Sequence, residues 1–330
     1  MLPATEAIRQ ALVRANHILV ITHINPDGDA FGSLTATGLA LRQMGKQVRL
    51  VCDDRVPERF RFLPLADQVH WAPAVDVHYD LIVAVDCGDE QRMGRAFADL
   101  PKPRPDVINV DHHITNTEFG AINLIDPQAA STTEILYGLF AELGLTLTAD
   151  IALSLLTGLV TDTLGFRTVG VTARTLEIAG ALIKAGADLS LVTMQALSLK
   201  PLTTLLLWRI GLNNMKLEDG LIWTSISYSE QEAVEYISSG TAGLVNLLAD
   251  VEEAAMSAVL VETSDGAVRV GFRCRPPYSV AELALNLGGG GHPLAAGCTL
   301  EGPLAKAEEL VVQLSKEEIR QQEAFLGIRD

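Results

Sequence analysis

The most constraining feature of this 330-residue sequence is a series of short apolar runs in its first half that alternate with segments of helical spacing. Several runs are rich in β-branched residues, which favour strands, and the third is apolar without a break, as in strands buried on both faces. We expect strands at 17–23, 47–54, 80–89 and 106–113, and helices at 28–45, 131–143, 149–163 and 172–186. Strands that alternate with helices predict an α/β fold, in which a largely parallel sheet is flanked by helices.

Acidic and histidine side chains follow three of the predicted strands. They are His23, Asp27 and Asp29 after the first strand, Asp86 after the third, and Asp111, His112 and His113 after the fourth. Asp162 follows an apolar helix and joins this set. Because ligands bind at the carboxyl edge of open α/β sheets, we expect these side chains to meet there.

Four carboxylates and two imidazoles of this set match what two divalent metal ions need. These six residues are His23, Asp27, Asp29, Asp86, His112 and Asp162. Four negative charges balance two divalent ions, whereas without metal the acids would repel one another. Mixed oxygen and imidazole ligands favour Mn²⁺, with Mg²⁺ and Co²⁺ as alternatives. Two such ions about 3.5–4 Å apart are the usual device for in-line attack on a phosphodiester.

Each element also has a plainer interpretation. Residues 25–29 alone would fit a turn with a helix N-cap or a calcium loop, although the bidentate Glu of an EF-hand is missing. Asp86 alone would fit an ordinary strand-end acid, and residues 112–113 a polar strand end. We favour the metal site because all of these residues stand together at the ends of predicted elements.

The regular alternation of predicted strands and helices ends at about residue 187. We expect a helical connector with Pro201, followed by two strands within 205–227 that are joined near Glu218-Asp219-Gly220. A helical stretch around 230–250 and strands at 255–263 and 267–274 should follow. The chain should end with a helix at 279–287, the loop 288–292 and a final helix from about 304. This order predicts a smaller, mixed α+β second domain. The chain thus divides into a metal-binding domain (1–190), a helical linker (191–210) and a substrate-binding domain (211–330), with a cleft between the two domains.

Charge and composition limit the classes of function. The net charge is −16 and aromatic residues make up only 5%, which argues against a protein that coats long nucleic acid. A small anionic substrate held by a few local cations remains compatible with this balance. No apolar run approaches the length of a membrane span, the N-terminus does not resemble a signal peptide, and the four cysteines show no CxxC spacing. We therefore expect a cytoplasmic protein with no membrane partner.

Five motifs in order resemble those of a known family. The segments HINPDGDAFGS (23–33), VAVDCGD (83–89), NVDHH (109–113) and TGLVTDTLGFRT (157–168) are similar to the four successive motifs of the DHH phosphoesterases. GGGGHPLAAG (288–297) resembles the glycine-rich signature of their associated C-terminal domain. The resemblance spans nearly the whole chain and implies a two-metal phosphoesterase.

The resemblance also implies a role for each residue of the first domain. One Mn²⁺ would be held by His23, Asp27 and Asp86, and the other by Asp29, Asp86, His112 and Asp162. Asp86 would thus bridge the ions, and a metal-bridging hydroxide would be the nucleophile. Asp111 would orient the histidine pair, and His113 would face the phosphate or protonate the leaving oxygen. Ser33 is expected close to the metals and is counted among the substrate-binding residues.

The second domain is expected to bind the substrate. The resemblance implies that Arg273 and His292 contact a terminal phosphate or the nucleotide. A run of four glycines, which includes Gly289, Gly290 and Gly291, lets backbone N–H groups approach an anion. The family usually has Ser on either side of the Arg, whereas this chain has Phe272 and Cys274.

The size of the chain narrows the substrate within the family. RecJ-type exonucleases carry further nucleic-acid-binding domains, and pyrophosphatases lack the GGGGH signature. The compact two-domain type cleaves short single-stranded oligonucleotides from an end and removes phosphate from pAp. A soluble cyclic di-AMP phosphodiesterase is the alternative enzyme. A nucleotide sensor without catalysis is disfavoured because all six ligand positions are filled. We expect no long duplex partner, and either a monomer or a homodimer.

Overall fold

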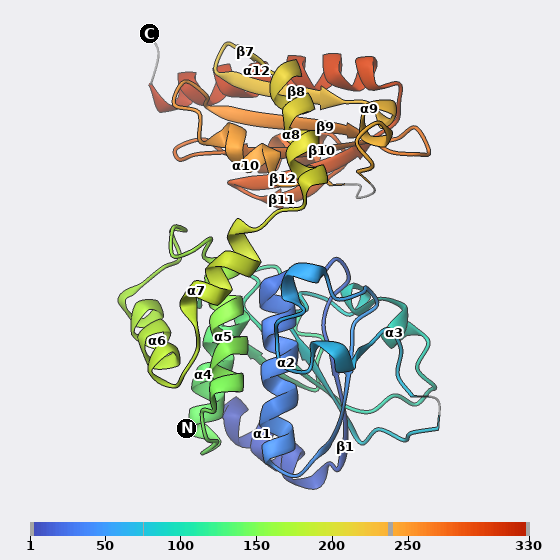
Figure 1. Ribbon diagram of the computed structural model, residues 1–330, viewed down its shortest axis with the longest axis vertical. Coiled ribbons are helices and arrows are strands. Elements are labelled where there is room, and N and C mark those ends of the chain that lie inside the picture. Colours follow the sequence, from blue (N-terminus) through green and yellow to red (C-terminus); the bar gives the residue numbers. More distant parts are fainter. Residues whose placement is uncertain (1–2, 75, 237–239, 328–330) are drawn as a thin grey trace. The chain divides into compact units, whose positions relative to one another are not determined.

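The computed structural model describes residues 3–74, 76–236 and 240–327. The chain forms two compact units, Met1–Leu199 and Lys200–Asp330, which we describe one at a time (Figure 1).

Among the described residues, no single helix is long and apolar enough to cross a membrane. The bent helical pair Leu189–Ser198 and Leu202–Asn214 meets that test of length and composition only when its two helices are taken together.

The first unit is built on a six-stranded sheet in which every paired strand is parallel. Its order is β3-β2-β1-β4-β5-β6, with bounds β1 His17–Ile21, β2 Gln47–Val51, β3 Val69–His70, β4 Leu81–Val85, β5 Val107–Asp111 and β6 Ile122–Ile125. The four predicted strands are present and form the middle of the sheet. The edge strands β3 and β6 were not predicted, because one is only two residues long and the other is only half-buried.

Helices pack on this sheet and bury apolar side chains on both of its faces. They are α1 Pro3–Arg14, α2 Gly28–Gln43, α3 Gly94–Ala98, α4 Thr132–Glu142, α5 Ala149–Asp162, α6 Ala173–Lys184 and α7 Leu189–Val192, followed by a π-helical turn at Thr193–Ser198. Successive strand residues point to opposite faces, so Ile18 and Val20 join one apolar cluster while Leu19 and Ile21 join another. The predicted α/β fold with a parallel sheet is confirmed.

Helices α2 and α5 lie against each other at glycines, and this contact brings two acids together. A Cβ atom at Gly32 would lie only 2.6 Å from the backbone oxygen of Ser154, and one at Gly158 would lie 2.3 Å from Oδ1 of Asp29. Small residues at such a contact let two helix axes approach closely. Asp29 near the start of α2 and Asp162 at the end of α5 therefore face the same region.

The second unit contains a mixed six-stranded sheet of order β11-β12-β10-β9-β8-β7. The strands are β7 Lys216–Glu218, β8 Leu221–Ile226, β9 Met256–Glu262, β10 Val268–Cys274, β11 Gly290–His292 and β12 Ala295–Leu300, and only β8 and β9 pair in parallel. Its helices are α8 Leu202–Asn214, α9 Tyr228–Glu232, α10 Leu244–Ala249, α11 Ala281–Asn286 and α12 Leu304–Leu326. The predicted mixed α+β domain is confirmed.

Three local predictions in this unit need correction. Residues 205–214 form the end of α8 and not a strand, because the i, i+4 pair Leu207 and Gly211 is buried on one helical face, with Gly211 closely packed on Leu244. A fourth prediction is confirmed, because the hairpin at Asp219-Gly220 joins β7 and β8, with positive φ at both positions. The stretch 230–250 holds two short helices, with residues 237–239 outside the described part. The glycine-rich loop ends in the edge strand β11.

Candidate metal centre

The site lies where the strand order of the first sheet reverses. From β1 the chain moves to β2 and β3 on one side, whereas β4, β5 and β6 extend the sheet on the other. His23 stands two residues beyond β1, Asp86 directly follows β4, and Asp111 ends β5. The carboxyl ends of neighbouring parallel strands open a crevice at such a reversal, and ligands bind there. The expected sheet edge therefore carries the expected residues.

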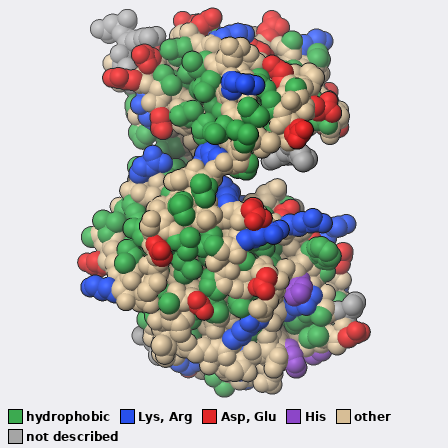
Figure 2. Space-filling view, viewed as in Figure 1, with side chains coloured by type: hydrophobic (Ala, Val, Ile, Leu, Met, Phe, Trp, Pro, Cys, Tyr) green, Lys and Arg blue, Asp and Glu red, His purple; other side chains and the backbone are tan. Residues whose placement is uncertain are grey.

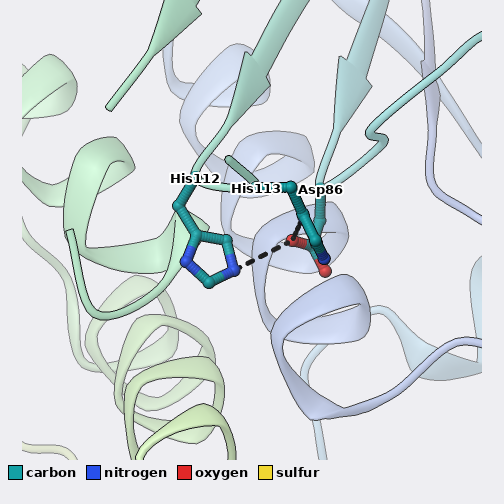
Figure 3. A group of neighbouring side chains, drawn as sticks. All are labelled: Asp86, His112 and His113. Atoms are coloured by element: carbon teal, nitrogen blue, oxygen red, sulfur yellow. Dashed lines mark ion pairs between the residues drawn. The ribbon is translucent and has the colours of Figure 1, made fainter. Parts of the chain in front are cut away.

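Asp86 is the centre of this cluster. Its side chain is 2% exposed, and its backbone adopts a positive φ of 61°. Oδ2 lies 3.4 Å from Nε2 of His23, whereas Oδ1 lies 3.9 Å from Nε2 of His112 and 3.7 Å from Nδ1 of His113. Figure 3 shows the carboxylate facing the two neighbouring histidines. The two oxygens thus face different imidazoles.

One possible ligand set consists of His23, Asp27 and Asp86, whose donor atoms all lie within 4.8 Å of one another. Nδ1 of His23 lies 2.8 Å from the backbone oxygen of Ile24, and Nε2 is the ring nitrogen directed at Asp86. Asp27 caps helix α2, because its Oδ1 accepts hydrogen bonds from two backbone N–H groups at the start of that helix.

A second set consists of Asp29, His112 and Asp162, again with donor atoms within 4.8 Å. Nε2 of His112 lies 3.3 Å from Oδ2 of Asp162. The buried carboxylate of Asp29 accepts hydrogen bonds from the backbone N–H groups of Thr132 (2.6 Å) and Thr133 (3.1 Å) at the start of α4. A helix N-terminus stabilises a negative charge, so α4 fixes Asp29 in place.

Burial and crowding displace the pKa values of the three buried carboxyl groups Asp29, Asp86 and Asp162. Burial and the nearby charge of Asp86 raise the pKa of Asp29 to about 7, and burial with the charge of Asp29 raises that of Asp162 well above its usual range. Burial alone would raise the pKa of Asp86, but the hydrogen bond from His23 and the neighbouring imidazoles lower it instead. Buried carboxylates that resist ionisation in this way are stabilised by bound cations.

The pKa values of the three histidines are also raised. Burial opposes their protonation, yet the hydrogen bond and charge of Asp86 raise the pKa of His23, and the charges of Asp29 and Asp86 raise that of His112. For His113, the hydrogen bond to Asp111 outweighs burial and raises the pKa. The metal-free cluster therefore holds protons that a metal ion must displace.

Metal binding should consequently weaken as the pH falls below about 7, because Asp29, with a pKa of about 7, must lose its proton to become a ligand. Calorimetric titration with Mn²⁺ at about pH 6 and about pH 8, in two buffers of different ionisation heat, measures both affinity and proton release. We expect weaker binding and more released protons at the lower pH. Equal affinity at both pH values, without proton release, would contradict this electrostatic description.

The stability of the metal-free protein should follow the same groups. The pKa of Asp29 is higher in the folded chain than in the unfolded one, so its contribution to stability is present below the unfolded-state pKa and is lost as the pH rises through about 7. Added Mn²⁺ should therefore raise the melting temperature more at about pH 8 than at about pH 6.

Other predicted residues lie in different surroundings. Asp111 is fully buried and its Oδ1 accepts the Nδ1–H of His113 at 2.7 Å. Ser33 is also fully buried, and its Oγ has no hydrogen-bond partner in the described part of the chain. Ser33 is as deeply buried as Asp29 and Asp86, and its assignment to the substrate-binding residues stays a prediction.

In the second unit, Arg273 and His292 lie on one face of the sheet. Arg273 on β10 and His292 on β11 both pair with Ala295 on β12, and directly paired residues share a face. Two strand spacings separate them by roughly 10 Å. A phosphate and its attached nucleoside could be contacted from both positions.

The glycine run has a packing role as well. Cβ atoms at Gly289 and Gly291 would lie 2.1 Å from the backbone oxygen of Gly297 and 2.5 Å from that of Ala295, so β12 requires glycine at both positions. The N–H of Gly289 donates to the backbone oxygen of Ala284 and is thus already used within the unit. The predicted contact of this N–H with an anion would compete with that hydrogen bond.

Sequence reasoning missed three residues around the cluster. The hydroxyl of Thr132 donates to Oδ1 of Asp86 at 2.8 Å, and Nη2 of Arg92 lies 2.9 Å from Nδ1 of His23. The side chain of Asn116 contacts Asp111. Only Thr132 carried a signal, since it follows the N-cap Ser131 in a pattern that marks a helix start.

An α/β sheet with acids and imidazoles gathered at its carboxyl edge defines the class of a metal-binding hydrolase, and comparison with known proteins gives the family. A model described as the DHH family, N-terminal domain, matches residues 17–159, and one described as the DHHA1 domain matches residues 232–321. The chain therefore belongs to the DHH family of phosphoesterases and is an enzyme. The resemblance found in the sequence is confirmed.

Similar proteins cover almost the whole chain. A Thermus thermophilus protein named bifunctional oligoribonuclease and PAP phosphatase NrnA is 35% identical over 308 residues, which span 92% of this chain and 90% of the relative. A Bacillus subtilis protein of the same name is 27% identical over 90% of this chain and 93% of its own. The crystal structure of an exopolyphosphatase-related protein from Bacteroides fragilis matches with a TM-score of 0.89 at 22% identity, covering 98% and 97% of the two chains, which supports the fold.

Proposed function

We propose that this enzyme hydrolyses short oligonucleotides from an end and removes phosphate from pAp, with two divalent metal ions held around Asp86. The observation that carries the proposal is the pair of ligand sets, His23–Asp27–Asp86 and Asp29–His112–Asp162, on the two sides of one buried carboxylate. The names of the full-length relatives support the choice of substrates.

The donor set fits divalent ions. Four carboxylates and two imidazoles without thiolates suit Mn²⁺, with Mg²⁺ and Co²⁺ as alternatives. Burial and neighbouring acids raise the pKa values of Asp29 and Asp162, and a bound cation would favour the ionised form of both. When bound, two such ions lower the pKa of a water molecule and neutralise charge on the phosphate. Asp86 would contact both ions, with Asp29, His112 and Asp162 on one side and His23 and Asp27 on the other.

His113 would act on the leaving group. Its Nδ1–H donates to Asp111, so Nε2 is the atom left for the substrate. The raised pKa favours the protonated ring, which can give a proton from Nε2 to the leaving oxygen. Asp111 orients that ring and stabilises its positive charge from a fully buried position.

The second unit would bind the phosphate or nucleoside away from the reaction. Arg273 is half-buried, and burial lowers the pKa of its guanidinium. A partly desolvated cation gains most from an anionic ligand, and the planar fork of Arg suits a phosphate. Gly290, Gly291 and His292 on β11 would complete this binding surface. Lys and Arg are interspersed with Asp and Glu on the visible face of both units (Figure 2), which suits a small substrate better than a long strand.

The cellular setting follows from the same features. All four cysteines are free and buried, as expected in a reducing cytoplasm, where we place the enzyme. Because one chain supplies every proposed metal ligand, the proposal holds for either a monomer or a homodimer.

The test is a parallel hydrolysis assay with Mn²⁺ on pAp, pApA, cyclic di-AMP and a single strand of about 24 nucleotides. We expect fast turnover of pAp and pApA and little attack on the long strand. Preference for cyclic di-AMP would instead identify a cyclic dinucleotide phosphodiesterase. No turnover of any substrate by the metal-loaded protein would reject the proposed function and favour a nucleotide sensor.

A further inference from the structure

Asn116 lies in the loop after β5, close to the cluster but outside both ligand sets. Its side-chain Nδ2 donates to Oδ2 of Asp111 at 2.5 Å and to the backbone oxygen of Cys87 at 3.0 Å. Its backbone N–H donates to the backbone oxygen of His113 at 3.0 Å. The residue therefore connects the end of β5, the segment after β4 and the histidine pair.

The orientation of the Asn116 amide is fixed by its four partners. Oδ1 accepts hydrogen bonds from Nδ2 of Asn109 at 3.1 Å and from the backbone N–H of Glu118 at 2.7 Å. Two acceptors thus face Nδ2, and two donors face Oδ1. A rotated amide would place oxygen against the Asp111 carboxylate and the Cys87 carbonyl, so only one orientation satisfies every group.

The Asn116 amide determines which oxygen of the Asp111 carboxylate faces the two histidines. With Oδ2 bound to Asn116, the other oxygen, Oδ1, accepts the backbone N–H of His112 at 2.8 Å and Nδ1–H of His113 at 2.7 Å. Asp111 is fully buried, and so is Asn109 on the far side of Asn116. Buried polar groups linked in this way form a chain of hydrogen bonds that holds the Asp111 carboxylate in place.

We propose that Asn116 is a positioning residue that acts on the reaction through Asp111 and His113. By holding Oδ2 of Asp111, it keeps Oδ1 in line with Nδ1–H of His113, so that Nδ1 keeps its proton when Nε2 gives one up and Nε2 is directed at the leaving oxygen. The kinetic part of this inference rests on the proposed function, whereas the tautomer of His113 does not. A group that orients a catalytic ring affects turnover more than substrate binding.

The test compares two single variants, Asn116→Ala and Asn123→Ala. Asn116→Ala is also combined with His113→Gln and compared with His113→Gln alone. Asn123 is a matched control, because its side chain, on β6, also bonds the loop between β5 and β6, at Glu118 and Gly120, but makes no hydrogen bond to Asp111. We expect Asn116→Ala to lower kcat by roughly 10- to 100-fold with KM and Mn²⁺ affinity unchanged, and Asn123→Ala to leave kcat unchanged. In the His113→Gln background, Asn116→Ala should have no further effect.

A second readout does not depend on activity. In the Mg²⁺-loaded protein, at a pH high enough for the His113 ring to be neutral, its ¹⁵N resonances should show one tautomer with the proton on Nδ1, and Asn116→Ala should mix the tautomers. An unchanged tautomer overturns the inference even if none of the tested substrates is turned over. An equal loss of kcat in both His113 backgrounds, or a loss of metal affinity, also overturns it, because either result indicates a general structural role.

Discussion

Replacing Asp86 with asparagine should abolish metal-dependent hydrolysis, with kcat lower by about 10³-fold or more. The substitution keeps the shape of the side chain but removes the charge that we place between two cations, and such contacts are worth several kcal/mol to the transition state. Asparagine also tolerates the left-handed backbone at this position, where φ is 61°, so the fold should be retained. Hydrolysis of pApA and calorimetric titration with Mn²⁺ measure the two consequences.

Asp89→Asn is the matched control for this experiment. Asp89 lies three residues further along the same loop, where its Oδ1 accepts the backbone N–H groups of Gln91 and Arg92, and it belongs to neither ligand set. We expect it to bind Mn²⁺ and to turn over substrate like the unmodified enzyme. If Asp86→Asn still bound two ions with unchanged affinity, the bridging role of Asp86 would be wrong.

Replacing Arg273 with alanine should lower kcat/KM for pAp and pApA by about 100-fold, which corresponds to about 2.8 kcal/mol. The reason is the loss of charge-assisted hydrogen bonds from a half-buried guanidinium to a phosphate. Mn²⁺ affinity should stay the same, because every proposed ligand lies in the first unit. Steady-state kinetics on both substrates, with calorimetry as a parallel readout, measure the effect.

Arg269→Ala controls for the loss of a positive charge on the same strand. Arg269 stands four residues before Arg273 on β10, and therefore on the same face, but pairs with Thr299 at the opposite end of the strand. We expect a change of less than about 2-fold, as is usual for a surface charge. Equal losses in the two variants would show that overall charge matters and that Arg273 is not a specific phosphate ligand.

The alternation of apolar runs and helical segments was enough to predict the parallel sheet and the mixed second domain. His23, Asp86 and Asp111 stand at the carboxyl ends of three predicted strands. This position also predicted that they would meet, because parallel strands share one carboxyl edge. These signals are local, and they depend only on the order of elements along the chain.

Features that depend on tertiary contact could not be predicted in this way. The run at 205–214 has apolar content that fits either a strand or a helix, and the packing of Gly211 against Leu244 decides for α8. The contacts of Thr132 with Asp86 and of Asn116 with Asp111 join distant or irregular segments and have no periodic pattern. The burial of Ser33 likewise follows from its packing in the first unit and not from its distance in sequence from Asp29.

The most direct test of the two-metal centre is anomalous X-ray diffraction from crystals of the Mn²⁺-loaded enzyme. We predict two manganese peaks roughly 3.5–4 Å apart, both in contact with Asp86. One ion should lie beside His23 and Asp27, and the other beside Asp29, His112 and Asp162. A single peak, or two peaks without Asp86 between them, would contradict the proposed centre.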